Sequence, residues 1–220
     1  MTEPASAPVH ISVVLDRSGS MQPIADDIVG GFNAFLAEQR ARPGAVRLTL
    51  AQFDSREPFE VLIDGADLHR VPDLARSAYQ PRGSTPLYDA VGQMVAHVDD
   101  AIAERAREGL PEEDQVVAIV TDGLENHSMR FNRADVFRLI EERRRAGWVF
   151  VFLGADQDAY AAGGQMGFAP RGRVAWEKTP EGVKKMWGDL SHSTDSHRAK
   201  PRERRRSEAD EFHTERPEEK

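Results

Sequence analysis

One short stretch decides the fold prediction: Val13-Val14-Leu15-Asp16-Arg17-Ser18-Gly19-Ser20-Met21. Its apolar part extends back to His10 and is typical of a buried β-strand, because aliphatic residues fill a short run. The strand ends at an acid, and two hydroxyl side chains follow at alternate positions. Asp16, Ser18 and Ser20 thus offer hard oxygen atoms directly after a strand, which suggests half of a divalent-cation site.

The composition indicates one folded domain. The chain has 220 residues, a formal net charge of -8 and no cysteine. This length supports one sizeable hydrophobic core, and the negative charge disfavours nucleic acid as the main partner. The lack of cysteine excludes disulfides, thiol catalysis and cysteine-rich zinc sites.

The two ends of the chain differ from its middle. The first residues have neither the basic start nor the apolar core of a signal peptide, and no apolar run is long enough to span a bilayer. We therefore expect a soluble, cytoplasmic protein with no membrane partner. We also expect a disordered lead-in over residues 1–8, a folded domain over residues 9–188 and a disordered, charged tail over residues 189–220.

Strand and helix patterns alternate through the folded region. The predicted strands cover residues 10–15, 46–53, 59–63, 116–120, 148–153 and 173–176. The predicted helices cover residues 22–40, 86–102, 133–146, 158–166 and 180–188. The second and third strands are joined by too few residues for a helix, so they should pair antiparallel. The pattern predicts a doubly wound, Rossmann-like α/β fold: a mostly parallel six-stranded sheet with one antiparallel edge strand and helices on both faces.

In such a sheet, ligands bind beyond the carboxyl ends of the strands, where the strand order reverses. An aspartate follows the strand 116–120, and a threonine opens the helix that precedes it. If that strand is a neighbour of the first strand, the following side chains converge: Asp16, Ser18, Ser20, Thr85 and Asp122. Two carboxylates and three hydroxyls suit Mg²⁺, or Mn²⁺ or Ca²⁺, and leave the metal able to accept an anion from outside.

These loops resemble the metal-ion-dependent adhesion site (MIDAS) of von Willebrand factor type A domains. The residues that match are Asp16-x-Ser18-x-Ser20, Thr85 and Thr121-Asp122-Gly123. The resemblance implies direct metal contact by the hydroxyls, with the two aspartates nearby, often through water. It also implies a partner protein whose Glu or Asp carboxylate completes the metal shell. The sequences of residues 14–21 and 152–159 resemble those of the intracellular bacterial or phage branch of these domains.

Simpler roles exist for the same residues. Each hydroxyl taken singly is equally consistent with a helix cap or a turn. Asp89 is either an acid behind the metal ligands or a favourable charge near a helix N-terminus, and we favour the second. Asp54 and Asn126 either order water around the metal or lie on the polar surface. The glycine pair Gly30-Gly31 suggests close packing of the first helix against the sheet.

An enzymatic alternative also starts from Asp16. Magnesium-dependent phosphotransferases or phosphatases of the haloacid dehalogenase type place a nucleophilic acid after the first strand. They also require a second acid at the position of Ser18, and this chain lacks that acid. We also predict no histidine, cysteine or lysine beside the metal that could act as a base. The sequence therefore favours a protein-binding module that is not an enzyme.

Overall fold

The computed structural model describes residues 7–213, which form one six-stranded sheet. The strands are β1 (Val9–Asp16), β2 (Val46–Phe53), β3 (Glu60–Asp67), β4 (Asp114–Thr121), β5 (Val149–Ala155) and β6 (Arg173–Trp176). Their order across the sheet is β3-β2-β1-β4-β5-β6. The pair β2–β3 is antiparallel and the other pairs are parallel, which confirms the predicted fold class.

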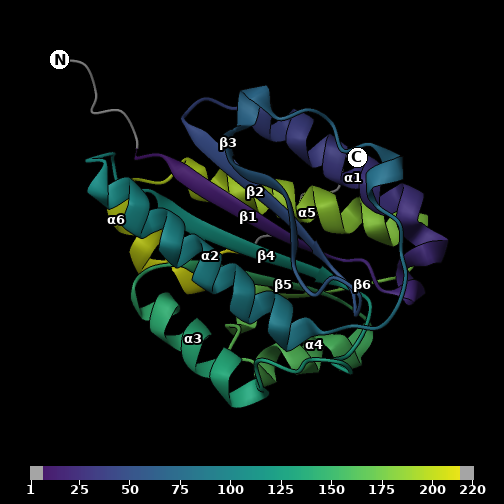
Figure 1. Ribbon diagram of the computed structural model, residues 1–220. Coiled ribbons are helices and arrows are strands. Elements are labelled where there is room, and N and C mark those ends of the chain that lie inside the picture. The colour runs from purple at the N-terminus through teal and green to yellow at the C-terminus, as the bar shows by residue number, and fades with distance from the viewer. Residues whose placement is uncertain (1–6, 214–220) are drawn as a thin grey trace.

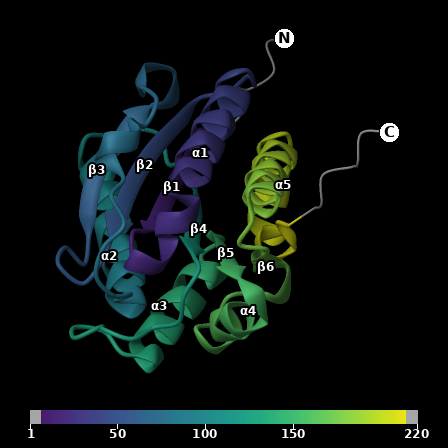
Figure 2. The same ribbon diagram turned by 90° about the vertical axis from the view of Figure 1, so that its right-hand side faces the viewer.

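Helices cover both faces of the sheet (Figures 1 and 2). They are α1 (Ala25–Arg40), α2 (Leu87–Arg107), α3 (Arg133–Arg145), α4 (Asp156–Gln165), α5 (Pro180–Arg198) and α6 (Arg202–Ser207). One apolar core joins α1 and α5 to the sheet, and a second core joins α2, α3 and α4 to the opposite face. Alternate residues of β1 enter opposite cores, because successive side chains of a strand point to opposite faces.

The central strands position the loops that carry the predicted site. Every residue of β1 and β4 is buried, which explains why aliphatic residues fill most of both strands. These two strands are neighbours, and Leu15 lies opposite Val120 in their parallel register. The strand order reverses between them, so the loops after Asp16 and Thr121 open at the same edge of the sheet.

The C-terminal segment differs from the predicted disordered tail. The boundary at residue 188 falls inside α5, and α6 follows it. Leu190 and Phe212 are buried in the core, and Arg205 is 1% exposed beside Asp114. Charged residues here face acids of the folded domain instead of solvent, which composition alone does not reveal. Residues 1–6 of the predicted lead-in, and residues 214–220, lie outside the described residues.

The glycine pair in α1 has a different partner from the one predicted. A Cβ at Gly31 would lie 2.1 Å from Cδ1 of Trp187, so the helix approaches α5 rather than the sheet at this point. Trp187 itself is 2% exposed and packs against Phe32 and Phe35. A Cβ at Gly30 would meet nothing within 4 Å. The first glycine is therefore not required by packing, and the second is.

This pair offers a matched test of the contact between α1 and α5. Gly31→Ala is expected to lower the free energy of unfolding by about 3 kcal/mol, because the new methyl group overpacks a buried indole. Gly30→Ala is expected to leave it unchanged or raise it by up to about 1 kcal/mol, because alanine is the better helix former. Urea denaturation measures both variants. Equal effects at the two positions would contradict this packing arrangement.

Within residues 7–213, none of the helices combines the length and the apolar character needed to cross a membrane.

Candidate metal centre

The loop after β1 is folded around the carboxylate of Asp16. This side chain is 0% exposed. Its Oδ1 accepts a hydrogen bond of 2.7 Å from the backbone N–H of Ser18, and its Oδ2 accepts one of 2.6 Å from the Thr121 hydroxyl. The second bond crosses from β1 to β4, so it ties together the two strands at the point where the strand order reverses.

The other predicted ligands lie around this carboxylate. The hydroxyls of Ser18 and Ser20 are 3.1 Å apart, and the Ser20 hydroxyl donates to Asp122 Oδ1 at 2.7 Å. Thr85 precedes α2, and its Oγ1 lies 3.4 Å from the position of a Cβ at Gly123. The structure therefore brings the three predicted loops together at one edge of the sheet, and their role as metal ligands stays a prediction.

The electrostatics of this cluster favour a cation. Burial raises the pKa of the Asp16 carboxyl to about 7, although hydrogen bonds from Thr121 and Ser18 oppose the rise. A positive charge next to a buried carboxylate favours its ionised form. The available donors are carboxylate and hydroxyl oxygens, which suit Mg²⁺, Mn²⁺ or Ca²⁺ and not a thiophilic metal. The residues present thus fit a hard divalent cation.

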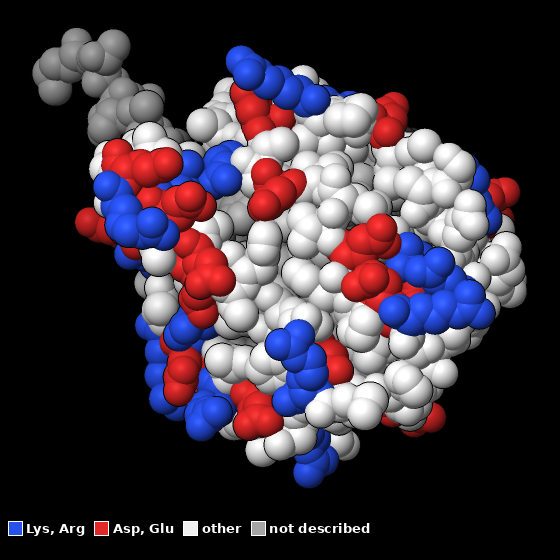
Figure 3. Space-filling view, in the orientation of Figure 1, with Lys and Arg blue, Asp and Glu red and all other residues white. Residues whose placement is uncertain are grey.

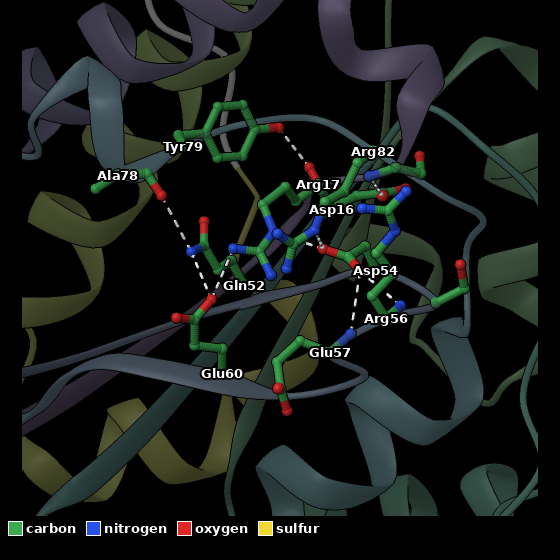
Figure 4. A network of polar contacts seen from close by, with 12 residues as sticks. Asp16, Arg17, Gln52, Asp54, Arg56, Glu57, Glu60, Ala78, Tyr79 and Arg82 are labelled. Carbon is green, nitrogen blue, oxygen red and sulfur yellow. Dashed lines mark hydrogen bonds and ion pairs between the residues drawn. The ribbon is translucent and has the colours of Figure 1, made fainter.

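A network of ion pairs and hydrogen bonds holds the loop that follows β1 (Figure 4). Arg17 stands between the first two candidate ligands, is 4% exposed, and contacts Asp54 Oδ2 at 2.8 Å and Glu60 Oε2 at 2.6 Å. Arg82 also contacts Asp54, at 2.9 Å, and its backbone N–H donates to the Arg17 carbonyl. The Tyr79 hydroxyl donates to the carbonyl oxygen of Asp16. The loop after β1 is therefore held by the residues after β2, by β3 and by the segment before α2.

The alternative that Asp54 lies on the polar surface is therefore wrong. This residue is 0% exposed. Burial alone would raise the pKa of Asp54. The backbone N–H groups of Arg56 and Glu57 and the guanidinium of Arg17 lower this pKa by more than burial raises it, so the net shift is downward. Its carboxylate is ionised and anchors the network in Figure 4.

The loop after Asp122 has no regular secondary structure but is firmly held. Asp89, 2% exposed, accepts backbone hydrogen bonds from Met129, Arg130 and Phe131 at 2.8 to 2.9 Å. This role is more specific than the helix-dipole charge that we favoured. Asn126 accepts from the Thr85 N–H at 2.8 Å, and its own N–H donates to the Thr85 carbonyl at 3.1 Å. Both residues fix a candidate ligand loop.

Sequence reasoning missed Lys178, and the prediction of no lysine beside the site is wrong. Its ammonium forms an ion pair with Asp122 Oδ2 and donates to the Ser20 carbonyl. Lys178 follows the end of β6 by two residues. The rule that directed attention to the residues after β1 and β4 applies equally to β6, so the same reasoning could have found it.

Among residues 7–213, no three His, Cys, Asp or Glu side chains lie close enough together to hold a metal ion. A metal at this edge would depend on the serine and threonine hydroxyls as well as on the two carboxylates.

No family model matches the chain, and no curated protein matches it. Solved structures do. The pilus adhesin SpaC of Lactobacillus rhamnosus GG aligns with a TM-score of 0.69 at 14% identity, over 88% of this chain and 30% of the adhesin. Proximal thread matrix protein 1 of the mussel byssus, with a zinc-occupied MIDAS motif, aligns with a TM-score of 0.55 at 13% identity, over 85% of this chain and 48% of that one.

The SpRpn10 VWA domain aligns with a TM-score of 0.55 at 11% identity, over 81% of this chain and 93% of that domain. This chain therefore spans less than half the length of the first two proteins and nearly the whole of the third. Identities this low support a conclusion about fold. Residues 7–213 of this chain have the von Willebrand factor type A fold.

Proposed function

We propose that this chain is a protein-binding module in which a divalent cation captures an acidic group of a partner protein. The observation that carries the proposal is the convergence of three loops, which bring together two buried carboxylates and three hydroxyls as candidate ligands. Ser18, Ser20 and Thr85 would contact the metal, and Asp16 and Asp122 would balance its charge. The cation, when bound, supplies a positive site that a Glu or Asp carboxylate of the partner can complete.

The surface beside this cluster suits a protein partner. Leu124 is 48% exposed and Met129 is 88% exposed on the loop after Asp122. Because hydrogen bonds to Asp89 and Asn126 hold this loop, these apolar side chains can be buried by a partner without a large ordering cost. We propose that the partner carries large apolar side chains next to its acidic residue. The cytoplasmic location stays an expectation from the sequence.

The charge distribution gives no support to nucleic acid as the partner. On the face shown in Figure 3, Lys and Arg side chains lie beside Asp and Glu side chains. The net charge of the chain is -8. A nucleic-acid surface needs basic groups gathered on one face, so that phosphates are neutralised.

Binding of the metal alone is the first prediction. Mg²⁺ at tenfold excess over its dissociation constant is expected to raise the free energy of unfolding by about 1.4 kcal/mol, because the cation binds the folded chain alone. The melting temperature should rise by about 3 °C. Thr85→Ala should abolish this rise, and Ser84→Ala, one residue earlier, should keep it. If Mg²⁺, Mn²⁺ and Ca²⁺ all leave the melting curve of the unmodified chain unchanged, the proposed function fails.

Capture of a partner protein is tested by passing candidate partners over the immobilised chain and comparing what is retained in Mg²⁺ with what is retained in chelator. A specific partner should be retained in Mg²⁺, lost in chelator and lost with Thr85→Ala. It should also be weakened by Met129→Asp, which leaves the metal cluster intact but places a charge on the neighbouring surface. Retention that is equal in chelator would contradict metal-dependent capture.

The phosphotransferase alternative has less support from the geometry. Asp16 is 0% exposed, and both of its carboxylate oxygens accept hydrogen bonds from within the fold. A nucleophile must reach its substrate, and this side chain lacks a free surface for attack. Metal-dependent release of phosphate from an aryl phosphate, lost in Asp16→Ala, would overturn the assignment as a binding module.

A further inference from the structure

Lys178 brings a positive charge into the candidate metal centre from a distant part of the chain. It lies in the short connection between β6, which ends at Trp176, and α5, which begins at Pro180. Its ammonium contacts Asp122 Oδ2 and the Ser20 carbonyl oxygen. The Asp122 side chain is 0% exposed, whereas that of Lys178 is 36% exposed. The lysine therefore enters the cluster from the solvent side.

The backbone beneath this lysine is fixed on both sides. Thr179 caps α5 by accepting from the N–H of Gly182 at 3.0 Å, and its own N–H donates to the Glu177 carbonyl at 2.8 Å. A Cβ at Gly182 would lie 2.1 Å from that carbonyl oxygen, so only glycine permits this approach. The connection is thus held in place, and the lysine needs to order little more than its own side chain to reach the cluster.

The contact completes the donor set of the two carboxylates. Asp16 receives the Ser18 N–H and the Thr121 hydroxyl, and Asp122 receives the Ser20 hydroxyl and the ammonium of Lys178. Two buried carboxylates close together are unfavourable without a compensating positive charge. Lys178 provides that charge at the same carboxylate that the predicted metal needs.

We propose that Lys178 is a tethered cation that competes with the divalent metal for Asp122, so that metal binding displaces the ammonium to solvent. The inference rests on the proposed function and adds a control of metal affinity to it. An ammonium on a flexible stem suits this role, because it is well hydrated and can leave through the exposed side of the site at little cost. The site then has a lower affinity for metal and stays balanced in charge when metal is scarce.

Mn²⁺ titration by calorimetry, with the metal alone as the probe, tests this competition. Lys178→Met is expected to bind Mn²⁺ about tenfold more tightly than the unmodified chain, because the competing charge is gone. Without metal the same variant should melt at a lower temperature, and at saturating Mn²⁺ this difference should shrink or vanish. Lys184→Met, an exposed lysine of α5, should match the unmodified chain in both respects.

A second measurement follows the lysine directly. Acylation by an amine-reactive reagent, read by mass spectrometry, should be slow at Lys178 in chelator and several-fold faster in Mn²⁺. Lys184 serves as the internal reference, since its rate should not depend on metal. This readout does not require a partner and does not require a variant to fold.

The outcomes separate the two proposals. If the unmodified chain binds Mn²⁺ but Lys178→Met binds it equally or more weakly, or if metal leaves Lys178 acylation unchanged, the competition is overturned and the proposed function stands. If Lys178→Met binds Mn²⁺ and the unmodified chain binds no divalent cation, the competition for Asp122 is supported, but the proposed function of the unmodified chain fails. If neither chain binds any divalent cation, both proposals fail.

Discussion

Replacing Asp54 with alanine is expected to lower the free energy of unfolding by about 3–5 kcal/mol. The carboxylate is 0% exposed and contacts Arg17 and Arg82 together with the backbone N–H groups of Arg56 and Glu57. Its removal leaves the guanidinium of Arg17, which is 4% exposed, with Glu60 as its remaining acidic contact in this network. A buried charge that loses its counter-charge is costly, because the low-polarity interior replaces water poorly.

The control is another aspartate paired with arginine, but at the surface. Asp73 pairs with Arg40 at 3.1 Å and its side chain is 67% exposed, so Asp73→Ala should cost less than about 1 kcal/mol. Urea denaturation near pH 7 compares the two. Adding Arg17→Met to Asp54→Ala should cost less than the sum of the single changes, since the unpaired charge is removed as well. Additive losses would contradict a buried pair.

The same pair predicts a pH dependence of stability. Folding lowers the pKa of Asp54, so its contribution is present above the ordinary carboxyl pKa and is lost as the pH falls through the folded value. The unmodified chain should therefore lose stability in acid more steeply than Asp54→Ala does. Parallel acid limbs for the two chains would argue against this assignment.

A chain that ends at Ala199 is expected to be less stable by at least about 5 kcal/mol, which approaches the whole stability of a typical domain. The truncation exposes the core contacts of Phe212, which is 2% exposed. It also removes Arg202, Arg205 and Arg206, which pair with Asp114. Asp114 is 4% exposed and would remain as a buried charge without those partners.

Point variants show whether this loss comes from the proposed contacts. Arg205 is 1% exposed and donates to the Ala7 carbonyl at 3.0 and 3.1 Å, as well as pairing with Asp114. Arg205→Met should therefore lower the melting temperature by several degrees, and Arg204→Met, whose pairing with Glu208 is exposed, should not. A stable, soluble chain ending at Ala199 would instead favour the disordered tail predicted from composition.

Local signals predicted most of the sheet correctly. Short apolar runs indicated β1, β2, β4 and β5, and the brief connection between residues 53 and 60 predicted the antiparallel edge pair, because it is too short for a crossover helix. The predicted helix 133–146 corresponds to α3, and the side chain of Asn132 caps it by accepting from two backbone N–H groups. These features depend on residues close in sequence, so the sequence carries them directly.

Long-range pairing defeated the same reasoning in the C-terminal segment. The charged composition predicts a solvated tail for the arginines near residue 205, yet the acids that pair with them, Glu112 and Asp114, lie far away along the chain. The prediction that Gly31 packs against the sheet was wrong for a related reason, because this glycine contacts Trp187 on another helix. Composition reports polarity but not the identity of a distant partner.

The sequence by itself determined the type of fold and the chemistry of the candidate site. Short apolar strands that alternate with amphipathic helices require a mostly parallel sheet covered on both faces, and the oxygen-bearing residues after two of these strands are candidates for hard-metal ligands. Only the tertiary structure decided which residues surround the candidate ligands. The ion pair of Arg17 and Asp54 supports the loop after β1, Asp89 holds the loop after Asp122, and Lys178 pairs with Asp122. The reason is physical, since buried charges are stable only next to partners, and folding, not proximity in sequence, provides those partners.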